Sequence, residues 1–121
     1  MNTFVHRITT RFVCALRGIY YALTRDFSFK TQFFAGGLFV VAFWFLLRPL
    51  RDIEVMLLIF SWLLILITEL QNSAFEHALD KLHPERHDKI GRGKDMAAGA
   101  VLTAGFFALC VVVWILVQHT I

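Results

Sequence analysis

Four polar side chains recur at three- and four-residue spacing in the middle of the chain: Glu69, Asn72, Glu76 and Asp80. On an α-helix, where successive residues are about 100° apart, these positions fall within a sector of about 80°. Like charges on one helix face repel each other, so the stripe does not favour stability. Carboxylate and amide oxygens suit Mg²⁺, particularly where nucleotide phosphates complete its shell. The stripe therefore predicts magnesium and phosphate chemistry, and pairing of Glu76 or Asp80 with bases such as Lys94 is the structural alternative.

A second candidate segment, Lys89-Ile-Gly-Arg-Gly-Lys-Asp95, precedes the last apolar stretch. We predict a loop here, because its two glycines allow the backbone geometries often found around phosphates and Lys94 supplies a positive charge. Asp95, followed by Met-Ala-Ala, is also typical of a helix N-cap. A Walker A motif is excluded, since Asp88 and Asp95 stand where that motif needs Gly and Ser or Thr.

Zinc and thiol chemistry are not indicated by the remaining candidates. His83 and His87 are four residues apart, but Pro84 disturbs the helix they would share and no third ligand is near. Cys14 and Cys110 are far apart, without CxxC spacing or an obvious His partner. We interpret both as structural thiols and expect neither a disulfide framework nor nucleophilic catalysis.

The elements that carry these residues are predicted to cross a membrane. The 121 residues are 58% hydrophobic and 17% charged, whereas soluble domains average about 25% charged. Met96 to Val117 is long enough to span the hydrocarbon, which needs about 20 apolar residues. Phe33 to Leu47 is extended by residues 29–32 at the interface, and Val55 to Thr68 by continuing through Glu69, which places that carboxylate near the membrane boundary. We predict an all-α membrane protein of one domain, residues 1–121, with transmembrane helices over 29–48, 53–82 and 95–118.

Residues 3–26 are predicted to form an amphipathic helix in the plane of the membrane interface. Apolar side chains from Phe4 to Leu23 recur at three- and four-residue spacing, with the arginines largely outside that stripe. Lys and Arg number five before the first apolar block, two in the first loop, five in the second loop and none after the last span. The positive-inside rule then places the N-terminus and second loop in the cytoplasm and the C-terminus outside. Basic residues between apolar blocks do not form the face that nucleic acid needs, so no nucleic-acid partner is expected.

The run ELQNSAFEHALD, from Glu69 to Asp80, and the following GRGKDMAAGAV resemble the prokaryotic integral-membrane diacylglycerol kinase family, which includes undecaprenol kinases. Residues 11–18 and 26–30 are similar to its surface-helix and first-span motifs, so the resemblance covers nearly the whole chain. It implies a homotrimer of three-span subunits in the bacterial cytoplasmic (inner) membrane. Such an enzyme transfers the γ-phosphoryl group of MgATP to the primary hydroxyl of a membrane lipid, at composite sites on the cytoplasmic side.

The resemblance also implies roles for single residues. Glu69 would be the general base, at a boundary where burial favours carboxylate protonation. Asn72 would orient Glu69 or the acceptor, and Lys94 would bind phosphate during transfer. Mg²⁺ would be held by Glu76 and by Asp26, where the family usually has the longer Glu. The ATP site would comprise Arg7, Asp26, Glu76, Asp80, Glu85, His87, Lys94 and Asp95, and the lipid would border Glu69, Ala98 and Trp114.

Two acceptor lipids and one non-enzymatic function stay open. The GRGKDM stretch and the length favour diacylglycerol, which would become phosphatidic acid, whereas AAGAVL is similar to the undecaprenol kinases, which make undecaprenyl phosphate. A small membrane subunit that docks a partner helix through the polar stripe is the alternative from another class. An ion or proton pathway would need ionisable residues at mid-membrane depth in several spans, and only the second span has one, near its end.

Overall fold

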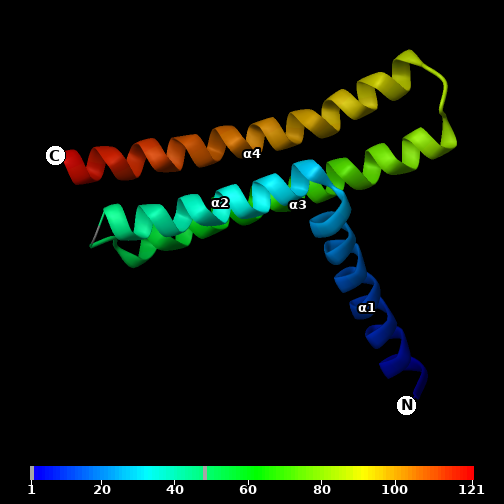
Figure 1. Ribbon diagram of the computed structural model, residues 1–121, viewed down its shortest axis with the longest axis horizontal. Coiled ribbons are helices and arrows are strands. Elements are labelled where there is room, and N and C mark those ends of the chain that lie inside the picture. The colour runs from blue at the N-terminus through cyan, green and yellow to red at the C-terminus, as the bar shows by residue number, and fades with distance from the viewer. Residues whose placement is uncertain (1, 48) are drawn as a thin grey trace.

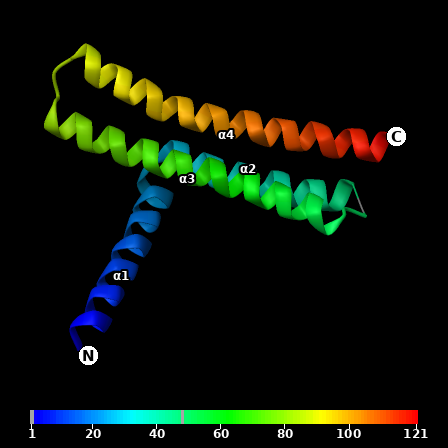
Figure 2. The same cartoon turned by 180° about the vertical axis from the view of Figure 1, so that it is seen from behind.

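A computed structural model describes residues 2–47 and 49–121, and these residues form helices without strands. Helices α2, α3 and α4 lie side by side, and α1 leaves this bundle where α2 begins (Figures 1 and 2). The predicted all-α architecture is therefore confirmed. The helices are α1 (Asn2–Arg25), α2 (Phe27–Leu46), α3 (Asp52–Leu82) and α4 (Asp88–Thr120).

By length and composition, α2, α3 and α4 are each able to cross a membrane, as predicted. The 20 residues of α2 rise about 30 Å, which matches the hydrocarbon thickness, whereas α3 and α4 rise about 46 and 50 Å. The connection between α2 and α3 lies at the same end as the C-terminus of α4 (Figure 1). The extra length of α3 and α4 therefore extends past the start of α2, at the end where these two helices are connected. We call this part of α3 and α4 the overhang.

Several predicted helix boundaries differ from the observed ones. The predicted loop over 89–95 is helical, because α4 begins at Asp88. The N-cap is His87, whose Nδ1 accepts the Lys89 N–H at 3.2 Å, so the prediction of Asp95 as N-cap is wrong. Two glycines cost a helix about 1 kcal/mol each relative to Ala, which the packing of α4 on α3 offsets. At the end of the first span, the predicted terminus at residue 48 lies outside the described residues.

Large apolar side chains remain exposed over most of the bundle, and the buried apolar core is small. One cluster joins Ala22, Phe29 and Leu66 where α1, α2 and α3 meet. A second cluster, at the other end of the bundle, contains Leu58, Val111 and Ile115. The apolar face of α1 is also uncovered, with Phe4 71% exposed. These exposed faces are what helices need in order to contact lipid along the bundle and along an interfacial α1.

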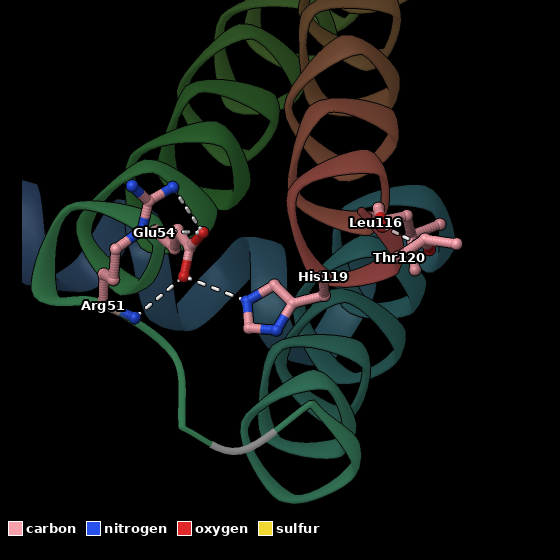
Figure 3. A network of polar contacts seen from close by, with 5 residues as sticks. All are labelled: Arg51, Glu54, Leu116, His119 and Thr120. Carbon is pink, nitrogen blue, oxygen red and sulfur yellow. Dashed lines mark hydrogen bonds and ion pairs between the residues drawn. The ribbon is translucent and has the colours of Figure 1, made fainter.

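A buried polar network closes the end of the bundle where α3 starts and α4 ends (Figure 3). Arg51 donates to Oε1 of the fully buried Glu54 from Nε at 3.1 Å and from Nη2 at 2.8 Å. Oε2 accepts the backbone N–H of Arg51 at 2.8 Å and lies 3.2 Å from Nε2 of His119 on α4. The Arg51 guanidinium also lies over the Trp114 ring, 5.4 Å from its centroid. This network therefore connects the first turn of α3 with the last two turns of α4.

Candidate active site

The predicted polar stripe begins at Glu69, which lies on the inner side of α3 and is only 5% exposed. It lines a groove of about 650 Å³ with Asn72 of α3 and with Ser28 and Gln32 of α2. The opposite wall is formed by α4 between Ala98 and Leu109 and carries only apolar side chains. We call this cavity the Glu69 groove. It combines a carboxylate at one side with a hydrocarbon-compatible wall at the other.

Asn72 separates the Glu69 groove from a second cavity of about 470 Å³ between α3 and α4, which reaches Phe75 and Gly93. Its Oδ1 atom is buried and accepts no hydrogen bond from any described residue. An unpaired buried amide oxygen is costly, so it is an acceptor available to a ligand.

A third cavity, of about 490 Å³, lies between α1 and α3 and contains Asp26, Ser73 and His77. Asp26 is the N-cap of α2, and its Oδ1 accepts the Phe29 N–H at 3.0 Å. Partial burial raises the pKa of Asp26, but hydrogen bonds from Ser73 and from the Phe29 and Ser28 backbone, together with the charge of His77, lower it below its ordinary 3.8. Asp26 is therefore ionised at neutral pH and suited to hold a cation.

The end of the stripe lies on the overhang, where Asp80 of α3 forms an ion pair with Lys94 of α4. Asp80 therefore pairs with a basic residue, which was the structural alternative to a role in chemistry, and this pair brings Lys94 to the stripe. Glu76, one turn before Asp80, is half-buried, and Asp95 is exposed beside Lys94. The stripe and Lys94, predicted from separate segments, therefore meet across α3 and α4.

Other predicted site residues are not brought to the stripe within this chain. Arg7 lies in the first part of α1, which runs away from the other helices (Figure 1). Glu85 and His87 lie in the connection between α3 and α4, where His87 caps α4. Ala98 does line the Glu69 groove. Trp114 instead lies against Arg51 at the other end of α4.

Four polar neighbours of the predicted site were not given a role from the sequence: Ser28, Gln32, Ser73 and His77. Ser73 and His77 share a helix face with Glu69, being four and eight residues further along α3, so helical spacing could have indicated them. Ser28 and Gln32 belong to another helix, and no spacing within one segment relates them to Glu69.

The donors present fit a Mg²⁺ ion that shares its shell with phosphate, but they do not form a complete metal cage. Among the described residues, no group of three or more His, Cys, Asp or Glu side chains could hold a metal ion. Mg²⁺ is usually bound through one or two carboxylates, with waters and substrate phosphates completing six oxygens. Asp26 and Glu76 match that number and each carries a hard oxygen ligand, with Asp26 in the cavity between α1 and α3 and Glu76 outside the lining of that cavity.

Comparison with known proteins identifies the class to which this fold and site belong. The family described as prokaryotic diacylglycerol kinase matches residues 13–116. A diacylglycerol kinase of Haemophilus influenzae is 35% identical over 102 residues, which cover 83% of this chain and 81% of that protein. A diacylglycerol kinase of Escherichia coli (strain K12) is 43% identical over 61 residues, 48% of this chain and half of that protein.

The chain therefore belongs to the prokaryotic diacylglycerol kinase family and is a membrane lipid kinase. This membership favours an enzyme over the non-enzymatic docking subunit.

Proposed function

We propose that this kinase transfers the γ-phosphoryl group of MgATP to the primary hydroxyl of diacylglycerol, which yields phosphatidic acid. The observation that carries the proposal is the Glu69 groove, where a carboxylate that is 5% exposed faces an apolar wall of α4. A lipid alcohol has the complementary form, a hydroxyl at the end of hydrocarbon chains. The names of the relatives favour diacylglycerol as the acceptor.

In this mechanism the acceptor hydroxyl is bound between Glu69 and Asn72. Before transfer, the hydroxyl can donate a hydrogen bond to Oδ1 of Asn72, the acceptor that the chain leaves unpaired, and it then turns its O–H toward Glu69. As the hydroxyl oxygen attacks the γ-phosphorus, the proton passes to Glu69, because a carboxylate is basic and an amide is not. Asn72 therefore orients the acceptor, and Glu69 is the general base.

The nucleotide is bound on the overhang side of the groove. Asp26 and Glu76 would hold Mg²⁺, which when bound with ATP neutralises charge on the phosphates. Lys94 would contact the transferred phosphoryl group. For this it would have to leave its ion pair with Asp80, which lies eleven residues, or about 16 Å, from Glu69 along α3. Asp95, Arg7, Glu85 and His87 would complete the nucleotide site.

The functional unit is proposed to be a homotrimer in the bacterial cytoplasmic membrane, with the N-terminus and active site cytoplasmic and the C-terminus external. Arg7 supports shared sites, because the first part of α1 extends away from the remaining helices of its own chain (Figure 2). The uncovered apolar faces of the bundle provide surface for both lipid and other subunits. The distribution of Lys and Arg supports the orientation.

The test is transfer of labelled γ-phosphate from MgATP to diacylglycerol and to undecaprenol, side by side in mixed micelles. Preferred labelling of diacylglycerol is expected, and Glu69→Gln should remove it while the protein keeps its assembly state. Asp52→Asn, which removes an exposed carboxylate at the other end of α3, is the matched control. Preferred labelling of undecaprenol would replace the acceptor in this proposal, and full activity of Glu69→Gln would refute the assignment of the base.

A further inference from the structure

Trp62 of α3 is seated against two consecutive glycines of α2, Gly36 and Gly37, which we call the glycine notch. A methyl group added at Gly36 would lie 2.5 Å from Trp62 Cδ1 and 2.6 Å from Nε1. One added at Gly37 would lie 3.1 Å from Cζ2 of the same ring. Both distances are shorter than ordinary contact, so the indole is held where only glycine leaves room for it.

The same indole is bonded to the part of α2 that lines the Glu69 groove. Trp62 Nε1 donates to the backbone carbonyl of Gln32 at 3.2 Å. The Phe33 ring packs on Trp62 with centroids 5.6 Å apart. Gln32 lines the groove together with Ser28, one turn earlier on α2, and with Glu69 of α3. Trp62 thus fixes both the distance and the register of α2 at the residue that forms one side of the groove.

We propose that Trp62, seated in the glycine notch, is a positioning residue that sets the width of the Glu69 groove and so the fit of the lipid acceptor. Trp62 does not line the groove and acts through Gln32. It precedes Glu69 by seven residues, which is two turns or about 10.5 Å along the same face of α3. The inference rests on the proposed function, because it assigns the groove to the acceptor.

A small cavity beside the glycine notch gives the Trp62 ring room to move, so a variant with a larger residue at Gly36 can still fold. It has a volume of about 90 Å³ and is lined by Trp62, Gly36, Ser61 and neighbouring apolar residues. An indole pushed away by a methyl group at Gly36 can move toward this space, so Gly36→Ala is expected to fold with a shift of about 1 Å between α2 and α3. Misplacements of about 1 Å remote from the chemistry can cost up to about a hundredfold in rate.

The test compares Gly36→Ala and Trp62→Phe by KM and kcat for both substrates. Gly36→Ala should raise the KM for diacylglycerol at least about fivefold while the KM for MgATP stays within about twofold. Trp62→Phe keeps ring atoms beside Gly36 but loses the Nε1–H that donates to the Gln32 carbonyl, so it should also raise the lipid KM with little change in the KM for MgATP. Gly99→Ala is the matched control, because no atom of a neighbouring side chain lies within 4 Å of the added methyl.

Two results would overturn the proposal. One is a wild-type lipid KM in Gly36→Ala. The other is a parallel loss for both substrates, which would indicate a general loss of structure.

A readout without catalysis separates this proposal from the proposed function. In a background with Cys14 and Cys110, both exposed, replaced by Ser, a cysteine at Gln32 is alkylated with an uncharged maleimide. The alkylation rate should rise in Gly36→Ala and in Trp62→Phe, and an unchanged rate would refute the positioning role. If the wild-type protein phosphorylates neither lipid, the proposed function fails while the alkylation rates still decide whether Trp62 sets the groove.

Discussion

Replacement of Glu54 by Gln is expected to destabilise the fold at the end of the bundle opposite the overhang. Glu54 is fully buried, and its contacts are all donors: Nε, Nη2 and the backbone N–H of Arg51, and Nε2 of His119. Since a carboxylate only accepts, Nε2 of His119 must carry a proton. In the Gln variant, the amide nitrogen would face a donor in either orientation of the amide group.

The expected loss of unfolding free energy depends on how exposed each hydrogen-bond partner of Glu54 is. The Arg51 side chain is 56% exposed, so its two bonds to Oε1 are partly replaced by water and contribute no more than about 1 kcal/mol. The bond from the Arg51 backbone N–H caps α3, and loss of such a cap costs about 1 kcal/mol. The His119 contact is a bond to a charged group with a partly buried partner, which adds about 1 kcal/mol. Because Gln keeps one oxygen, it loses either the Arg51 side-chain bonds or the backbone and His119 bonds, and we therefore expect Glu54→Gln to lower the free energy of unfolding by about 1–2 kcal/mol.

The measurement is the midpoint of unfolding in mixed micelles, followed by far-UV circular dichroism during titration with a denaturing detergent. The initial rate of phosphotransfer, measured well below the transition, should stay near the wild-type value, because the network lies far from Glu69. Asp52→Asn, which removes an exposed charge from the same turn, should leave the midpoint in place. A Glu54→Gln protein that unfolds with the wild-type midpoint, or that loses phosphotransfer while still fully folded, would refute this reasoning.

Three further predictions concern the candidate site. Glu76→Gln should raise the Mg²⁺ concentration for half-maximal rate at least about tenfold with little change in lipid KM, as expected when one of two carboxylate ligands is lost, and an unchanged Mg²⁺ dependence would remove its metal role. Lys94→Met should lower kcat by a factor of about 10²–10³. Asp80→Asn breaks the same partly exposed ion pair and should change the free energy of unfolding by less than about 1 kcal/mol. If the two variants lowered kcat equally, this would argue against a phosphate role for Lys94. The pKa of Asp26 is lowered in the folded protein, because its hydrogen bonds outweigh the effect of burial. The ionised carboxylate therefore stabilises the fold fully above the ordinary pKa of 3.8, and this contribution is lost as pH falls through the lowered pKa. The difference in unfolding free energy between the wild-type protein and Asp26→Asn, measured without metal, should therefore shrink below about pH 4, and a difference independent of pH would contradict this account.

The transmembrane helices could be predicted because their signal is local. Runs of apolar residues long enough to cross the hydrocarbon are a property of each segment, and α2, α3 and α4 follow them. The start of α4 could not be predicted in this way. Gly91 and Gly93 have a weak helix propensity, but the segment is helical since His87 caps it and the rest of α4 packs on α3.

In the candidate site, too, features within one helix could be predicted from the sequence, whereas features that join two helices could not. Glu69, Asn72, Glu76 and Asp80 share one helix, so their common face follows from the angular spacing alone. The Asp80 pair with Lys94 could be stated only as an alternative, because it joins two helices. Ser28, Gln32 and the glycine notch with Trp62 depend on how α2 lies against α3, which only the three-dimensional structure provides. Trp114 shares α4 with Ala98 but lies against Arg51 at the other end of that helix, a separation that similarity of short segments does not show.

The unequal lengths of the three spanning helices make the protein sensitive to the thickness of its host bilayer. Helix α2 rises about 30 Å and has no length to spare. In a bilayer with longer acyl chains, α2 would be too short, and the membrane surface would move along α3 and α4 into the overhang. Glu76 and Asp80 would then approach the hydrocarbon, and a water-soluble nucleotide would have to follow them. We therefore expect the acyl-chain length of the surrounding phospholipid to change the rate of phosphotransfer without any effector site.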